Sequence, residues 1–242
     1  MQKSALIIGA NGGIAQALIK KLSADSEFKH IDLVSRQALA ESHNCHAHVF
    51  DSSDPERVEQ FCMAQKDAGI LYDYVICTTG LLHRQGSDGL SPEKRLEDIN
   101  VAQLSEYFRV NSQIPAIWLR SLRHVLSKQH AATVVFFSAR VGSISDNQIG
   151  GWYGYRASKA ALNMLVKTAA VEYRRRFPLV SLACYHPGTV DTALSKPFQA
   201  KVPSNKLFSA EFTAQQLLDQ IPQFEPEHSP YYVDWEGKSI SW

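Results

Sequence analysis

Two residues in the segment YGYRASKAA, residues 153–161, have the types and the spacing that acid–base chemistry needs. Tyr155 lies four positions before Lys159, so in a helix the phenol and the ammonium share one face. A free tyrosine has a pKa of about 10 and is a poor acid–base catalyst at neutral pH. A neighbouring ammonium favours the phenolate and lowers that pKa. The spacing therefore predicts a catalytic tyrosine tuned by a lysine, although a surface helix that carries both residues fits the same pattern.

A glycine-rich loop lies near the start of the chain, in GANGGIA at residues 9–15. An apolar run precedes it, and a stretch with helical spacing follows it. Gly9, Gly12 and Gly13 allow a tight turn and a close approach of a phosphate, and a helix N-terminus adds free N–H groups. A strand-to-helix turn without a ligand is the alternative, but the flanking strand and helix favour a nucleotide site.

The next apolar run, residues 31–35, ends where a dinucleotide-binding fold contacts the ribose of its cofactor. An acidic residue there would bind the 2′-hydroxyl of NAD, but this chain has Ser35 followed by Arg36. A guanidinium can pair with a 2′-phosphate through two hydrogen bonds, so the sequence favours NADP(H) over NAD(H). A solvated arginine at a strand end is the alternative. Asp51 follows the third run and is placed to accept a hydrogen bond from adenine.

Apolar runs alternate with amphipathic stretches along the whole chain, a pattern that predicts β-α-β units. The expected strands are residues 5–9, 31–35, 47–50, 74–80, 132–138, 180–185 and 231–234. The expected helices lie near 13–23, 55–68, 101–128, 155–176 and 210–221. Right-handed crossovers then give one doubly wound α/β domain of the Rossmann type over residues 1–242, with a seven-stranded parallel sheet flanked by helices. The polar, proline-broken segment 193–209 is expected to form a lid over the substrate site.

The composition excludes several classes of function. The 242 residues carry a formal net charge of +1, which gives no field of one sign to attract nucleic acid or an anionic membrane. No apolar run reaches 18 residues, so we expect no membrane span and a cytoplasmic protein. The four widely spaced cysteines are expected to be reduced. The cluster HNCHAH at residues 43–48 runs into a strand without a partner cluster, so no metal site is predicted.

Taken together, these motifs resemble the short-chain dehydrogenase/reductase family over essentially the whole chain. The segment IGANGGIA resembles its glycine motif, with Ile8 and Ala15 in place of the usual threonine and last glycine. Of the family's NNAG motif, CTTG at 77–80 keeps only Gly80. Tyr155 and Lys159 match its YxxxK motif. The segments RVNSQ and HPGTVDT resemble its helix-asparagine and PG motifs.

The resemblance implies a role for each matching residue. Tyr155 would exchange a proton with a carbonyl or alcohol oxygen while hydride moves to or from the nicotinamide. Lys159 would also reach the nicotinamide ribose, and Asn111 would hold a water between the lysine and solvent, unless its amide only bonds to neighbouring main chain. The implied catalytic residues are Tyr155, Lys159, Asn111 and Ser138. The implied cofactor-binding residues are Gly9, Asn11, Gly12, Gly13, Ile14, Arg36, Asp51, Ser52, Thr79, Gly80, Tyr155, Lys159, Pro187, Gly188, Val190 and Thr192.

The serine that polarises the carbonyl in the family has no direct counterpart here. The family places it second in a Ser-Ser pair, three residues before a glycine; here that position is Ala139, before Gly142. Ser138 is the nearest hydroxyl, although adjacent strand residues point to opposite faces. Ser138 is the expected catalytic serine if it turns inward; Ser143, a main-chain N–H or a weakened site are the alternatives.

The sequence thus predicts an NADP-dependent oxidoreductase acting on a small carbonyl or alcohol compound. The strongest rival is a nucleotide-binding regulatory or signalling protein with weak activity, because Ala139 departs from the family and parts of the chain resemble its C-factor-like subgroup. A methyltransferase would leave the YxxxK motif unexplained. Trp152 and Tyr153 are expected either to wall the substrate site or to belong to the core. The resemblance further implies a homodimer or homotetramer that pairs through the helices at 101–128 and 155–176.

Overall fold

The computed structural model describes residues 2–86 and 89–242 and confirms the predicted fold class. Seven parallel strands form one sheet in the order β3-β2-β1-β4-β5-β6-β9. Their bounds are β1 Lys3–Ile8, β2 Phe28–Ser35, β3 Cys45–Val49, β4 Tyr74–Cys77, β5 Ala132–Phe137, β6 Val180–His186 and β9 Tyr231–Asp234. The central strands are buried on both faces, which is why the sequence shows them as unbroken apolar runs.

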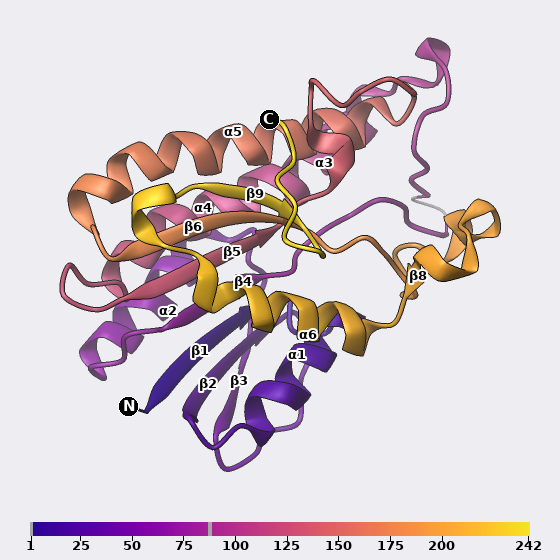
Figure 1. The fold of residues 1–242 in the computed structure, drawn as a ribbon. Helices are drawn as coiled ribbons and strands as arrows, with labels where there is room; N and C mark the ends of the chain where they lie inside the picture. Colours follow the sequence, from indigo (N-terminus) through magenta and orange to yellow (C-terminus); the bar gives the residue numbers. More distant parts are fainter. Residues whose placement is uncertain (1, 87–88) are drawn as a thin grey trace.

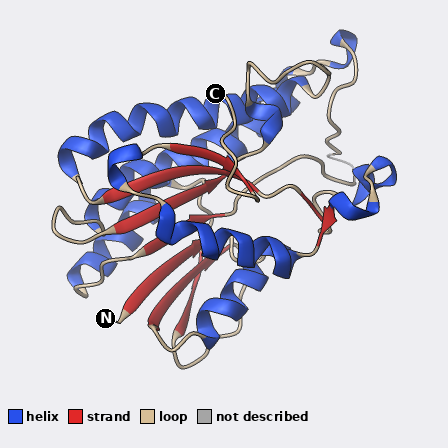
Figure 2. Cartoon of the chain, in the orientation of Figure 1, coloured by secondary structure: helices blue, strands red, loops and turns tan. Residues whose placement is uncertain are grey.

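Helices cover both faces of the sheet (Figures 1 and 2). On one face, α1 (Gly13–Ala24) and α6 (Ala210–Gln220) pack side by side and contribute Leu18 and Leu217 to one hydrophobic core. On the other face lie α2 (Pro55–Asp67), α4 (Ile114–Ser121) and the long α5 (Tyr153–Arg176), which form the second core. The side chain of Asp54 begins α2 by accepting the main-chain N–H groups of Glu56 and Arg57.

The sheet order reverses direction between β1 and β4. From β1 the chain builds outward to β2 and β3, then returns to place β4 on the other side of β1. In sheets of this kind, ligands bind in the crevice at the carboxyl ends of the strands where the order reverses. The glycine loop follows β1 and the CTTG segment follows β4, so the fold brings both predicted motifs to that crevice.

The helix expected at 101–128 is divided. Helix α3 (Val101–Phe108) runs into a π-helical turn, Arg109–Gln113, before α4 begins. Pro115 explains the interruption, because it has no N–H to donate to the carbonyl of Asn111 and its ring crowds that carbonyl. The N–H of Ile114 instead bonds to the carbonyl of Arg109, five residues back. The interruption falls on the predicted catalytic asparagine.

The predicted lid contains short elements of its own. Strand β8 (Leu207–Phe208) pairs with β7 (Thr189–Val190), and the helical turn Lys196–Lys201 lies between them. In Figure 1 this part projects beyond the carboxyl edge of the main sheet. Short helical turns also occur at Leu96–Asp98, Leu122–His124, Arg140–Gly142, Ser204–Lys206, Ile221–Gln223 and Pro226–His228.

In the part of the chain that the structure describes, no helix has the length and apolarity required to cross a membrane. All four cysteines are buried free thiols.

Candidate active site

Tyr155 and Lys159 both lie buried in the first two turns of α5. Their separation places them on one helix face, and Lys159 Nζ lies 5.9 Å from the centroid of the Tyr155 ring. The Tyr155 ring packs among aromatic side chains, with the rings of Tyr107 and Trp152 each 6.1 Å away, centroid to centroid. Leu82 and Leu90 complete this cluster.

The pKa of Tyr155 differs from the sequence-based prediction. Burial raises it well above its usual value, and the nearby Tyr232 raises it further. The expected lowering by Lys159 is therefore wrong for this structure, because loss of hydration outweighs any attraction to the ammonium. The phenol consequently keeps its proton throughout the physiological pH range, which is the form required to donate a proton.

Lys159 is held beneath the carboxyl end of β5. Its ammonium donates a hydrogen bond to the carbonyl of Phe137 at 2.8 Å. Burial lowers the pKa of Lys159 from 10.5 to about 8, so part of its charge is lost in mildly alkaline solution. A methyl group placed on Gly80 would lie 3.7 Å from Lys159 Nζ and 3.9 Å from Asn111 Oδ1. Gly80 is therefore the point at which the segment after β4 meets both predicted catalytic residues.

Asn111 ties three elements together. Its side-chain carbonyl accepts the N–H of Leu81 at 2.8 Å, and its amide donates to the carbonyl of Leu81 and to Ser158 Oγ. Ser112 Oγ donates to the main-chain carbonyl of Ser158 at 2.7 Å. These bonds fix the π-helical turn against both α5 and the segment after β4, which accounts for complete burial of the Asn111 side chain.

The structure does not support an inward turn of Ser138. Its hydroxyl donates to Asn163 Oδ1 at 2.6 Å, whereas Ala139 packs against the cluster that contains Tyr155. The two residues point apart because the strand geometry persists to this point. The hydroxyl of Ser143 accepts the N–H of Asp146 at 3.1 Å and so stabilises its own turn. The position that faces Tyr155 thus carries a methyl group.

A cleft of about 900 Å³ lies at the reversal point of the sheet, where β1, β2 and β4 end. Of the predicted cofactor residues, it is lined by Gly9, Asn11, Gly12, Arg36, Asp51, Ser52, Thr79 and Gly80. Gly9 has a φ of +81°, a conformation that favours glycine, and a Cβ there would lie 3.0 Å from Thr78 Oγ1. The loop can follow this path only without a side chain.

The electrostatics of the cleft come from a mixture of predicted and unpredicted residues. Partial burial opposes ionisation of Asp51, but hydrogen bonds from Ser53 and the charges of Arg36 and Arg109 lower its pKa overall. Arg84 and Arg109 both pair with Glu106, and these three residues also line the cleft. The sequence does not single out these three residues, because a charged residue on a loop or on an exposed helix face carries no distinguishing pattern.

The residues predicted to approach the nicotinamide end lie after β6. Pro187, Gly188, Val190 and Thr192 follow that strand in the segment that contains β7. Thr192 borders the glycine loop, since a Cβ on Gly13 would meet its methyl group at 3.1 Å. Ile14, in the first turn of α1, packs against the hydrophobic core and does not line the cleft.

Aromatic side chains connect the lid to Tyr155. Phe198, in the lid, packs against Trp152 with ring centroids 5.2 Å apart and against His83 at 5.7 Å. His83 Nε2 also lies 2.9 Å from the carbonyl of Ala193, where the lid begins. Trp152 therefore belongs to the wall between Tyr155 and the lid, while Tyr153 begins α5 outside this cluster.

The histidine cluster lies on β3, far along the sheet from Tyr155. His46 stacks on His30 of β2, and His48 contacts the buried carboxylate of Asp32 at 2.5 Å. Among the described residues, no group of three or more histidine, cysteine, aspartate or glutamate side chains could hold a metal ion.

Comparison with known proteins identifies the family. The family model for short chain dehydrogenases matches residues 3–203, so the chain belongs to this family of oxidoreductase enzymes, which bind a nicotinamide cofactor. C-signal of Myxococcus xanthus is 32% identical over 148 residues, which cover 61% of this chain and 83% of that protein. The 1-hydroxy-2-glutathionyl-2-methyl-3-butene dehydrogenase of Rhodococcus sp. (strain AD45) is 25% identical over 244 residues, 98% of each chain. An NADPH-bound carbonyl reductase from chicken fatty liver has the same fold, with a TM-score of 0.83, 20% identity and coverage of 100% of this chain and 99% of that one.

Proposed function

We propose that this protein is an NADP-dependent reductase of a small carbonyl compound, with Tyr155 as the proton donor. One observation carries the proposal. Gly80 lines the cofactor cleft and lies next to both Lys159 and Asn111, so the cleft comes close to Lys159, one helical turn from Tyr155 on α5. The aromatic and aliphatic cluster around Tyr155 then supplies an apolar place for the substrate.

The cleft has the features that a dinucleotide phosphate requires. Its floor is the glycine loop at the start of α1, where free N–H groups favour an anion. Arg36 lies at its edge directly after β2, with Gln37 beyond it and no carboxylate at that strand end. These residues suit a 2′-phosphate better than a free 2′-hydroxyl. The NADPH in the chicken carbonyl reductase supports the same choice.

The residues on α5 can complete the reaction. The reduced nicotinamide supplies a hydride to the carbonyl carbon when it is bound. Tyr155 donates its proton to the carbonyl oxygen, and its raised pKa keeps that proton available at neutral pH. Lys159 would hold the ribose hydroxyls of the cofactor, and Asn111 would hold a water between the lysine and solvent, through which a proton returns to the phenol.

The proposal is tested by following NADPH oxidation with aldehydes, ketones and diones, for the native protein and for Tyr155→Phe. We expect turnover in the native protein and its loss in the variant, which keeps the aromatic packing but has no proton to give. Equal rates in both proteins would remove Tyr155 from the mechanism.

Cofactor preference is tested at Arg36. Arg36→Ala should weaken NADPH binding by about 10- to 100-fold, the value of a lost pair of charge-assisted hydrogen bonds, and leave NADH binding unchanged. Dissociation constants can be measured by cofactor fluorescence. An equal loss for both cofactors would show that Arg36 supports the cleft without contacting a phosphate.

A regulatory role is the second candidate. Two observations favour it: Ala139 provides no hydroxyl beside Tyr155, and the chain is similar to C-signal. A regulatory protein would bind NADPH with ordinary affinity yet show no Tyr155-dependent turnover with any compound of the panel.

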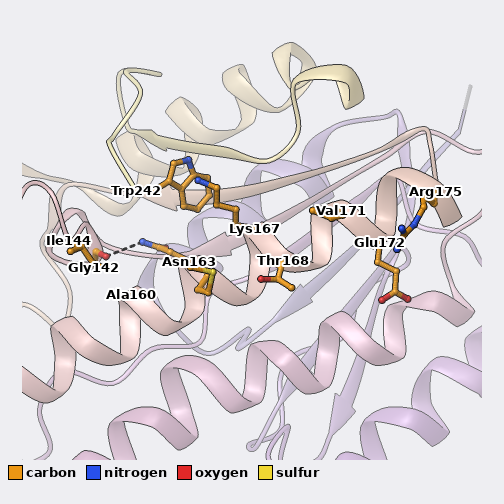
Figure 3. A pocket seen from close by; sticks show the side chains of 11 residues that line it. Gly142, Ile144, Ala160, Asn163, Lys167, Thr168, Val171, Glu172, Arg175 and Trp242 are labelled. Atoms are coloured by element: carbon orange, nitrogen blue, oxygen red, sulfur yellow. Dashed lines mark hydrogen bonds between the residues drawn. The ribbon is translucent and has the colours of Figure 1, made fainter.

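We also propose that the chain self-associates along α5. A groove of about 540 Å³ runs beside this helix and is shown in Figure 3. Met164 and Val171 line it, and both are more than half exposed, as is Ile144 at its end. Apolar side chains gathered on one helix face are typical of an interface, and a second copy is the partner that the family resemblance implies.

A further inference from the structure

The end of β5 contains two serines and an alanine, and only the alanine faces Tyr155. Ser138 donates to Asn163, and Ser143 is bonded within its own turn. Two other phenols lie close to Tyr155: Tyr107 donates to the carbonyl of Leu82 at 2.7 Å, and Tyr232 donates to the carbonyl of Ala139 at 2.7 Å. Among the described side chains at this site, Tyr155 therefore has the one hydroxyl group for which no hydrogen bond to another protein group is observed.

Within the described part of the chain, the absence of a second free hydroxyl group beside Tyr155 affects the transition state of carbonyl reduction. Hydride addition to a carbonyl carbon leaves negative charge on the oxygen, and each hydrogen-bond donor aimed at that oxygen contributes about 100- to 1,000-fold in rate. A site with one donor fewer reduces an ordinary ketone slowly. The deficit matters less for a substrate whose carbonyl is already activated, because an adjacent second carbonyl group withdraws electrons, makes the attacked carbon more electrophilic and stabilises the alkoxide inductively.

The side chains packed around Tyr155 indicate the rest of the substrate. Around Tyr155 lie the rings of Trp152 and Tyr107, and Phe198 of the lid covers Trp152. The charged groups Lys159 and Glu93 are held by other partners: Lys159 donates to Phe137, and Glu93 accepts the N–H of Gly154 and the amide of Gln103. Aromatic walls favour a flat, uncharged group.

We propose that the natural substrate is a neutral 1,2-dicarbonyl compound conjugated with a flat apolar group. This inference rests on the proposed reductase function. One carbonyl carbon gains a hydride from reduced nicotinamide, and its oxygen gains the proton of Tyr155. The product is a hydroxyketone, the nicotinamide leaves oxidised, and solvent returns a proton to Tyr155. The second carbonyl withdraws electrons from the reacting carbonyl and so compensates for the hydroxyl that Ala139 lacks.

The test uses three compounds of similar size: 1-phenylpropane-1,2-dione, propiophenone, which lacks the second carbonyl, and benzoylformate, which carries a charge. Their kcat/KM values are measured with NADPH for the native protein, Ala139→Ser and Ala139→Gly. Native protein should prefer the dione by at least about 100-fold over propiophenone. Ala139→Ser should raise the rate with propiophenone at least about tenfold and the rate with the dione by less than about threefold. Ala139→Gly changes the same position without adding a hydroxyl and should give no such selective gain.

Several outcomes would overturn the inference. They are equal reduction of propiophenone and the dione by native protein, an equal gain for both compounds in Ala139→Ser, or a preference for benzoylformate. In each of these the reductase function still stands, provided that Tyr155→Phe abolishes the activity. If NADPH binds and none of the three compounds is reduced while another carbonyl compound of the wider panel is, the inference fails and the reductase function stands; if no compound of the panel is reduced, both fail. NADPH affinity and thermal unfolding of each variant show whether the fold is intact.

Discussion

Lys159 is a buried ammonium that lowers the stability of the free protein. Its pKa is about 8 in the folded chain and about 10.4 in an unfolded one, so the unfolded state binds protons more strongly. The loss of unfolding free energy caused by this buried charge has its full size below a pH of about 8, and it disappears as the pH rises to about 10.5. The difference corresponds to roughly 3 kcal/mol. A residue retained at such a cost is consistent with a functional role for its charge.

Replacement of Lys159 by methionine should therefore stabilise the protein at neutral pH. Urea unfolding of native protein and Lys159→Met at pH 6, 7, 8 and 9 should show the largest gain at pH 6 and 7 and a smaller one at pH 9, because deprotonation relieves native protein only. Lys20→Met, on an exposed position of α1, serves as the control and should show no gain that depends on pH in this way. A gain for Lys159→Met that is constant with pH would contradict the assignment.

The direction in which the Ser138 side chain points changes the role that we expect for this residue. The sequence alone predicts that Ser138→Ala reduces turnover by orders of magnitude. Because the hydroxyl bonds to Asn163, we now expect the variant to lose about 1–2 kcal/mol of unfolding free energy and to change kcat by less than about threefold. Thermal unfolding and steady-state kinetics separate these effects. A hundredfold loss of kcat with an unchanged Tm would return Ser138 to the catalytic machinery.

At the scale of elements, Glu93 fixes the start of α5. Its side chain is 1% exposed, and it accepts the N–H of Gly154 at 3.1 Å and the amide of Gln103, on α3, at 2.8 Å. Its main-chain carbonyl accepts the N–H of Trp152, which has the strained φ of 53°. A carboxylate is also electrostatically favourable near a helix N-terminus, where the helix dipole is positive. Glu93 thereby sets the position from which α5 carries Tyr155 into the site.

Glu93→Gln should misplace this helix start. The new amide meets the amide of Gln103 donor to donor, so we expect kcat to fall about tenfold while NADPH affinity, set by the ends of β1, β2 and β4, is unchanged. The double variant Glu93→Gln/Gln103→Glu restores the donor–acceptor pair between the two side chains but loses the Gln103 bond to the carbonyl of Ser91, so it should recover part of the lost activity. Glu97→Gln, an exposed residue of the same segment, is the control. A double variant as impaired as the single one would show that Glu93 does not act through this pair.

The sequence predicted the bounds of some helices and strands more closely than those of others. The strands were placed closely because each is a short apolar run, and the helix expected near 55–68 agrees with α2. The division of the helix at Asn111 was missed, since helical periodicity continues through a π-helical turn and only Pro115 marks it. The contacts of Glu93 and Arg109 could not be predicted either, because they depend on which segments meet in space and not on local spacing.

At the scale of the whole molecule, the two cores and the site occupy different regions, which leaves part of α5 for association. The sheet is covered on both faces, and the cofactor cleft lies at its carboxyl edge. The outer face of α5 nevertheless exposes Met164 and Val171, whose burial in a partner would stabilise a dimer. The same groove reaches Asn163, which holds Ser138 and the carbonyl of Gly142 (Figure 3). Association would therefore restrict the motion of Asn163 and, through it, of Ser138 and Gly142 on either side of Ala139.

Val171→Asp should convert the proposed dimer to a monomer, because two buried carboxylates would face each other or lose their hydration at the interface. Size-exclusion chromatography with light scattering at micromolar concentration gives the mass directly. Met63→Asp, an exposed apolar position on α2, is the matched control and should leave the mass unchanged. NADPH affinity should be the same in both variants, since neither residue lines the cofactor cleft. A native protein that is already monomeric, or a Val171→Asp protein that remains dimeric, would show that α5 is not the interface.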